Sequence, residues 1–167
     1  MMVTNTRSMQ EKNEPTMYDK KIKEEFWTTF GRYMALNPSA SGEKVNWINY
    51  KTGVKHIQFR LFADDKMAAI YIELSNANPE SQKKLLDQFI RDKDLLEAFT
   101  NDSWQMQPHV TTGDGRTISR VYQEHEGVNV YFKSDWPAII SFLKSQLTGL
   151  DKFWHQQRDL YSFIADQ

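Results

Sequence analysis

The sequence predicts an α+β fold: a mostly antiparallel sheet of five to six strands, with helices on one face and a long C-terminal helix. Strand-like stretches come in two clusters and do not alternate one by one with helices, a pattern typical of α+β domains and not of parallel nucleotide-binding sheets. The expected order is one helix, three strands, one helix, two or three strands, and a last helix. If the helices cover one face, the opposite face of the sheet stays open.

The composition predicts one folded domain with no strong charge preference. The chain has 167 residues, no cysteine, and 21 basic against 22 acidic residues. Residues 1–16 are polar and aperiodic, so we expect a flexible tail before a single domain at 17–167. A net charge of −1 gives no general attraction to nucleic acid or anionic lipid. We read no signal peptide and no membrane-spanning run, which predicts a cytoplasmic protein.

The spacing of apolar residues predicts the first helix and then, where it changes from helical spacing to alternation, the first cluster of strands. Ile22, Phe26 and Phe30 recur at helical spacing, and the helix should end before Pro38. Strands are then expected at 45–50, 56–61 and 68–74, because β-forming residues there alternate with polar ones. Short turns between them predict an antiparallel meander.

A second helix and a second strand cluster follow. Asn78 and Pro79 are a helix start, and an apolar stripe continues to Phe99. Strands are expected at 103–110, 117–123 and 128–133. From Trp136 to Ile164 apolar residues return every three or four positions, which predicts a helix about 45 Å long.

The open face of the sheet is the candidate binding surface. Strand alternation places polar and aromatic side chains on the side away from the helices. These residues are His56, Gln58, Arg60, Tyr71, Glu73, Tyr131 and Lys133, and Arg120 and Tyr122 join them if the register of their strand agrees. Aromatic and basic groups on an open sheet suit single-stranded nucleic acid. The same set also suits a protein partner or a homodimer, and it is equally compatible with a plain solvated face.

No residue cluster has the spacing of a known chemistry. Asp64, Asp65 and Glu73 are the acids that a divergent metal-dependent hydrolase would use, but Ser75 stands where restriction-type nucleases need lysine. The four histidines are scattered and do not have metal-ligand spacing. We therefore predict no catalytic residue, no metal and no cofactor.

Several short motifs resemble one protein family. They are Glu25-Phe26-Trp27-Thr28-Thr29-Phe30-Gly31, Ile118-Ser119-Arg120-Val121-Tyr122, Glu126-Gly127-Val128 and Asp135-Trp136. Together they resemble the bacterial domain-of-unknown-function family 4268, from about Met17 to the C-terminus. The resemblance implies a compact domain that occurs alone or appended to longer, sometimes nuclease-like proteins. That context suggests nucleic-acid or defence roles by analogy only, and it brings no catalytic residues.

The sequence thus favours a non-catalytic module that contacts a protein partner or a second copy of itself. The alternative is a nucleic-acid-binding accessory domain linked to defence or nuclease systems. A divergent metal-dependent hydrolase is a third hypothesis. Nothing in the sequence predicts contact with a membrane.

Overall fold

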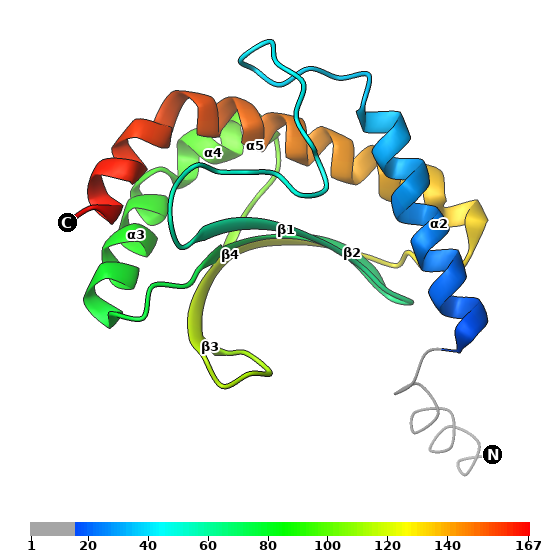
Figure 1. Ribbon diagram of the computed structural model, residues 1–167, viewed down its shortest axis with the longest axis horizontal. Coiled ribbons are helices and arrows are strands. Elements are labelled where there is room, and N and C mark those ends of the chain that lie inside the picture. Colours follow the sequence, from blue (N-terminus) through cyan, green and yellow to red (C-terminus); the bar gives the residue numbers. More distant parts are fainter. Residues whose placement is uncertain (1–15) are drawn as a thin grey trace.

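The computed structural model describes residues 16–167. An arched antiparallel sheet forms its centre, with the longest helix across the convex side of the arch (Figure 1). The α+β class and the long C-terminal helix are therefore confirmed, but the sheet has four strands, not five or six. Apart from Thr16, the tail predicted at 1–16 lies outside the described residues.

The first described helix, α2 (Met17–Met34), begins at a capping box. The Thr16 side chain accepts the Asp19 amide, and the Asp19 carboxylate accepts the Thr16 amide, so two otherwise unpaired amides at the helix start are satisfied. Phe26, Phe30 and Met34 are fully buried at a spacing of four. The helix ends ahead of Pro38, as predicted.

The sheet contains β1 (Ile57–Ala63), β2 (Met67–Leu74), β3 (Gln105–Thr111) and β4 (Thr117–Glu126). Its order is β1-β2-β4-β3, and every neighbouring pair is antiparallel. A tight turn joins β1 to β2, where Asp64 Oδ1 accepts the amides of Lys66 and Met67. β1 and β3 are therefore the two edges of the sheet.

The strand predicted at 45–50 is wrong, because backbone amides of this segment form local hydrogen bonds in place of pairing with a neighbouring strand. Asn46 Oδ1 accepts the amides of Ile48 and Asn49, which turns the chain. Trp47 is buried and donates its indole N–H to the Asn37 carbonyl at 2.9 Å. The segment is a loop that packs on the core beside β1.

The strand predicted at 128–133 is also wrong, and for a similar reason. Gly127, at φ 80°, ends β4. Asn129 donates its amide to the Asp135 carboxylate and accepts the Tyr131 amide, so these groups are not free to pair with a sheet. A short 3-10 turn, η1 (Lys133–Asp135), then leads into the last helix.

The helix predicted from Asn78 to Phe99 is divided in two at Asp92. These pieces are α3 (Pro79–Arg91) and α4 (Lys93–Thr100), and Asn78 caps the first by accepting the amides of Glu80 and Ser81. The Asp92 carboxylate accepts hydrogen bonds from Gln157 and Tyr161 of the last helix. The break therefore anchors the α3–α4 pair on that helix.

The last helix, α5 (Trp136–Ala165), has 30 residues and crosses the convex side of the sheet. It runs from the neighbourhood of α2 to that of α3 (Figure 1). Leu143, Leu147, Leu150 and Phe153 are completely buried, as are Ile70 and Ile72 of β2. A Cβ at Gly149 would lie 2.5 Å from the Phe99 carbonyl oxygen, so glycine at this position allows α4 to approach α5 closely.

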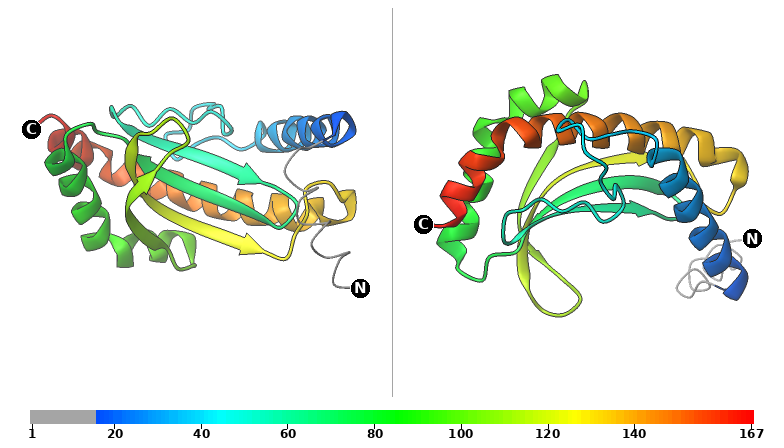
Figure 2. Two further views of the ribbon diagram at one scale, coloured as in Figure 1. Left: turned by 90° about the horizontal axis from the view of Figure 1, so that it is seen from below. Right: turned by 45° about the horizontal axis from the view of Figure 1, so that its top comes forward.

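The helices leave the concave side of the sheet uncovered. A view from below looks directly onto the strands, with α5 behind them and α2 beyond the end of the sheet (Figure 2). In β1 the even-numbered residues Gln58 and Arg60 are exposed, whereas the odd-numbered Ile57 and Phe59 are buried. The concave side is therefore the surface on which the predicted binding residues must be placed.

Candidate functional site: the concave face and the free edge of β1

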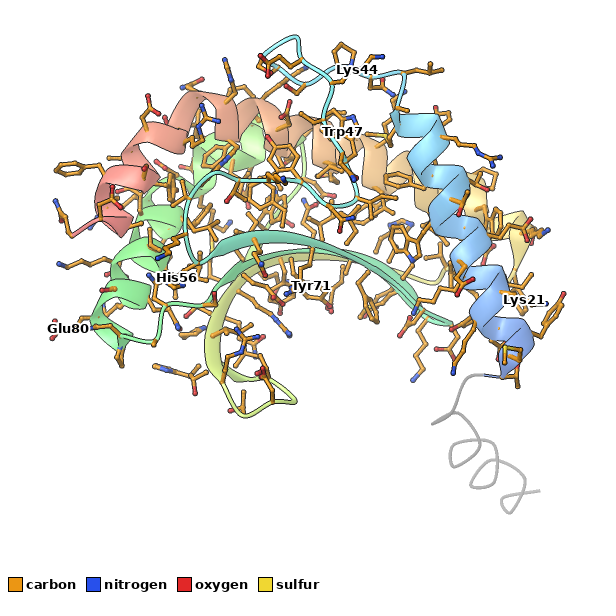
Figure 3. All side chains as sticks on the ribbon, viewed as in Figure 1. Lys21, Lys44, Trp47, His56, Tyr71 and Glu80 are labelled. Atoms are coloured by element: carbon orange, nitrogen blue, oxygen red, sulfur yellow. The ribbon has the colours of Figure 1, made fainter. Side chains whose placement is uncertain are left out.

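Strand register brings six of the nine predicted surface residues together. In one row, Tyr71 of β2 lies between Arg60 of β1 and Tyr122 of β4. In the other row, Glu73 of β2 lies between Gln58 of β1 and Arg120 of β4. Partners directly opposite in register project from the same face of a sheet. Figure 3 shows Tyr71 under the arch, on the side away from α5. The concave face therefore carries two rows of three residues across β1, β2 and β4.

Glu73 is the electrostatic centre of this face. Its Oε1 lies 2.6 Å from Arg60 Nε, and its Oε2 lies 3.6 Å from Arg120 Nε. Arg60 also donates to Gln58 Oε1 at 2.8 Å. The Glu73 side chain is only 12% exposed, so the carboxylate lies beneath the two arginines. One partly buried carboxylate thus lies near two cations.

Aromatic rings fill the space beside these charges. The Tyr71 ring lies 6.3 Å from that of Phe62 and 5.8 Å from that of Tyr122, and the Arg120 guanidinium lies 4.9 Å above Tyr71. The Tyr71 hydroxyl donates to Glu124 at 3.1 Å. Burial, and next the charge and hydrogen bond of Glu124, raise the pKa of Tyr71 to about 12. The phenol is therefore neutral at physiological pH.

The other three predicted residues do not belong to this surface. His56 lies just before β1 at φ 69°, and its carbonyl accepts the Ser75 amide. Tyr131 and Lys133 follow β4 in the segment that is not a strand. Lys133 forms an ion pair with Glu25 of α2 at 2.9 Å. Burial, and to a smaller extent nearby carboxylates, raise the pKa of Tyr131. The placement of Tyr131 and Lys133 on the sheet is corrected because the strand predicted for them is absent, whereas His56 lies one residue before β1.

Two side chains of the surface were missed. Phe62 continues the alternation of Gln58 and Arg60, so strand periodicity alone could have found it. Glu124 lies opposite Ala69 in β4, two positions beyond Tyr122. The strand expected at 117–123 stops one residue short of it, whereas β4 continues to Glu126.

Two of the three acids considered for hydrolysis take part in structural contacts. The Asp64 carboxylate accepts two amides of the β1–β2 turn, and Glu73 pairs with arginines. Within residues 16–167, no group of three or more histidine and acidic side chains is arranged to hold a metal ion. In the same part of the chain, no helix has the length and apolar character needed to cross a membrane.

The free edge of β1 is a second feature beside the concave face. His56 and Asp64 form ladder hydrogen bonds with the β2 side, so even-numbered β1 residues point their backbone groups at β2. The odd-numbered residues point theirs outward. Ile57 is satisfied by Val54 and by the Thr52 hydroxyl.

Phe59 and Leu61 have no such partner within residues 16–167. Between residues 16 and 167, no loop or side-chain hydrogen bond reaches their backbone N–H or C=O groups. A groove of about 520 Å³ runs beside them. Its apolar lining comes from Trp27 of α2, Ile48 and Tyr50 of the neighbouring loop, and the side chains of Phe59 and Leu61. An unpaired stretch of strand thus lies beside an apolar groove.

The other edge of the sheet is closed to pairing. β3 contains Pro108, which has no amide hydrogen, and its register with β4 shifts between Gln107 and Val110. His109, in this irregular stretch, takes a left-handed conformation at φ 58°. Proline and bulges are common means of preventing edge-to-edge association. β1 carries neither, so the two edges differ in what they can bind.

Fold and surface together define a small α+β domain with an open-faced antiparallel sheet and one accessible strand edge. The family model described as Domain of unknown function (DUF4268) matches residues 22–158. The chain belongs to this family, which confirms the resemblance seen in its motifs. No match to the chain was found among curated proteins or among solved structures.

Proposed function

We propose that this domain is a protein-binding module that holds an extended segment of a partner along the free edge of β1. The observation that carries the proposal is the outward, unpaired backbone of Phe59 and Leu61 beside an apolar groove. An extended peptide offers alternating N–H and C=O groups that complete such a ladder, while its side chains fill neighbouring pockets.

The ends of this edge favour a short peptide over a second copy of the domain. At one end the Thr52–Val54 loop already bonds to Ile57. At the other end Lys23 of α2 lies over the Phe62 ring at 5.6 Å. The accessible window is Gln58 to Leu61, about 13 Å of strand at 3.3 Å per residue. Symmetric pairing of two β1 strands would use the whole edge, of which the Thr52–Val54 loop already occupies one end.

The surroundings of the window define the partner's chemistry. Side chains on one side of a docked strand would enter the apolar groove with Trp27, Ile48 and Tyr50. Those on the other side would lie over the concave face beside Gln58 and Arg60. Lys51 is exposed at the groove and makes no ion pair with another residue of the described part. An extended segment that alternates apolar with acidic or polar residues fits best.

The charge balance of the concave face favours protein over nucleic acid. Arg60 and Arg120 share Glu73, and Glu124 adds a second negative charge beside Tyr71. A surface that follows phosphates needs excess positive charge. Tyrosine and arginine side chains with internal charge pairs are instead typical of the anchor residues in protein interfaces.

A peptide-display selection on the folded domain, followed by scanning of the selected peptide, tests this proposal. We expect selected peptides to alternate apolar and polar residues. N-methylation of single peptide amides should abolish binding at every second position only, because alternate amides point at β1. Uniform tolerance of N-methylation would overturn the proposal, as would failure to select any peptide. Pairing of two copies would appear instead as a dimer in sedimentation experiments.

A further inference from the structure

A second pocket lies on the outer side of the molecule, between α5 and the segment 39–51. It has a volume of about 690 Å³, within the usual range for small-molecule sites. Figure 3 places Lys44 on this segment, on the far side of α5 from the concave face. Most residues that line this pocket are polar or charged, among them Lys44, Lys51, Asp151, His155 and Arg158.

A buried carboxylate fixes the walls of the pocket. Asp151 is 3% exposed, and its two oxygens accept hydrogen bonds from the Ala40 amide at 2.7 Å and the Tyr50 hydroxyl at 2.6 Å. It therefore holds both ends of the 40–50 segment against α5. Trp154, next to it, donates to the Thr52 carbonyl at 2.8 Å. The pocket is therefore bounded by well-anchored elements.

The remaining charged groups are mostly cationic. Asp151, His155 and Arg158 follow at intervals of four and three, which places them on one face of α5. Lys44 and Lys51 face them from the loop segment. None of Lys44, Lys51 and Arg158 makes an ion pair with any residue from 16 to 167.

The acids of the pocket do not cancel these cations. Glu43 and Asp151 are its two carboxylates against three cations, and Asp151 is occupied by its hydrogen bonds. Lys44, Lys51 and Arg158 therefore gather around one concavity with only Glu43 and Asp151 as acids beside them, in a chain with net charge −1.

We propose that this pocket binds the phosphate group of a small molecule of up to nucleotide size. Arginine and lysine at the mouth of a pocket supply charge-assisted hydrogen bonds to phosphate oxygens. The Ser41, Asn46 and Asn49 side chains, which also line it, can accept or donate hydrogen bonds to the rest of the ligand. This site is distinct from the β1 groove, although Asn49, Tyr50 and Lys51 form the wall between them.

The test is titration calorimetry with inorganic pyrophosphate, adenosine triphosphate and citrate at an ionic strength of about 0.15 M. We expect saturable binding of at least one phosphate-bearing probe. Comparison of pyrophosphate with adenosine triphosphate shows whether the pocket prefers a free phosphate or a nucleotide. Arg158→Gln and Lys44→Gln should each weaken binding about tenfold, the cost of one charge-assisted hydrogen bond. Both residues are exposed and lie outside the β1 groove, so peptide binding there should persist.

Lys152→Gln is the matched control, because Lys152 is exposed on the same helix and does not line the pocket. It should leave the affinity unchanged. Equal weakening by Lys152→Gln and Arg158→Gln would mean attraction to general surface charge and would overturn the proposal. Failure of both phosphate probes to bind wild-type protein, or equally tight binding of citrate, would also overturn it.

Discussion

The carboxylate of Asp92 accepts a hydrogen bond from the Tyr161 hydroxyl at 2.8 Å. Asp92 marks the break between α3 and α4, and the Tyr161 side chain is completely buried on α5. Gln157 donates to the same carboxylate oxygen at 3.1 Å. The contact therefore ties the two short helices to the helix that spans the sheet.

Tyr161→Phe should destabilise the fold by about 1–2 kcal/mol. The change removes one donor from a half-buried carboxylate and leaves the ring packing in place. Urea unfolding followed by circular dichroism measures the loss. Tyr18→Phe is the control, because Tyr18 is 71% exposed, and it should change little. Equal stability of Tyr161→Phe and wild type would show that the hydrogen bond does not matter for the fold.

Gly149→Ala should cost about 1–3 kcal/mol, although alanine is the better helix former. The added Cβ would lie 2.5 Å from the Phe99 carbonyl oxygen and 3.0 Å from Thr100 Cα. Both are backbone atoms of α4, so relief requires the two helices to separate. Gly113→Ala, in open space, is the control. A thermal midpoint for Gly149→Ala at or above that of wild type would contradict the close approach.

Sequence periodicity predicted the parts of the fold that depend on which face a residue occupies. In β1, β2 and β4 the alternation placed Arg60, Tyr71, Glu73, Arg120 and Tyr122 correctly, because a period of two assigns each side chain to one face. The helical stripes likewise predicted α2 and α5.

The parts that periodicity missed depend on hydrogen bonds to particular partners. Asn46 and Asn129 lie among β-forming residues, and their side chains take the amides that a strand would need. The break at Asp92 depends on Tyr161, 69 positions later. The β1 edge was missed because strand order is a long-range property that alternation does not contain.

Raised tyrosine pKa values predict a loss of stability in alkali. Burial raises the pKa of Tyr50, Tyr71 and Tyr161, and a neighbouring carboxylate adds to the effect in each case. The pKa of Tyr71 rises to about 12. Above about pH 10 the unfolded chain releases phenolic protons that the folded chain retains, so stability falls with rising pH. Below that pH their contribution is fully present.

Urea unfolding between about pH 9 and pH 11 checks this direction. Tyr71→Phe should lose less stability over that interval than wild type, because one tyrosine with a raised pKa is gone. The difference between the two slopes isolates Tyr71 from lysines that titrate in the same range. Parallel slopes for the two proteins would contradict a raised pKa at Tyr71.

Glu73→Gln should lower the stability of the domain and make the concave face more positive. The change leaves Arg60 and Arg120 without their shared carboxylate, and we expect a loss of about 1 kcal/mol of stability. It also adds one net positive charge, so weak, salt-sensitive retention on single-stranded DNA should appear in the variant and not in wild type. Electrophoretic mobility shifts at several salt concentrations measure this.

The same assay separates the two readings of the surface. If wild-type protein shifts single-stranded DNA or RNA, and Arg60→Ala with Arg120→Ala removes the shift, nucleic-acid binding replaces the protein-binding proposal. The charge-matched control is Arg91→Ala, since Arg91 lies exposed on α3, outside the sheet.

Leu61→Pro should abolish peptide binding at the β1 edge and leave the sheet intact. The Leu61 amide points outward, away from the β2 ladder, and proline is tolerated on an edge strand where its missing N–H faces solvent. Leu61→Ala is the matched control, because it also removes the leucine side chain but keeps the backbone N–H. It should weaken packing in the groove and retain the hydrogen bonds of the backbone ladder. We expect fluorescence anisotropy to show at least a tenfold greater loss of affinity for proline than for alanine, about 1.4 kcal/mol. Equal losses in the two folded variants would mean that side-chain contacts alone hold the peptide.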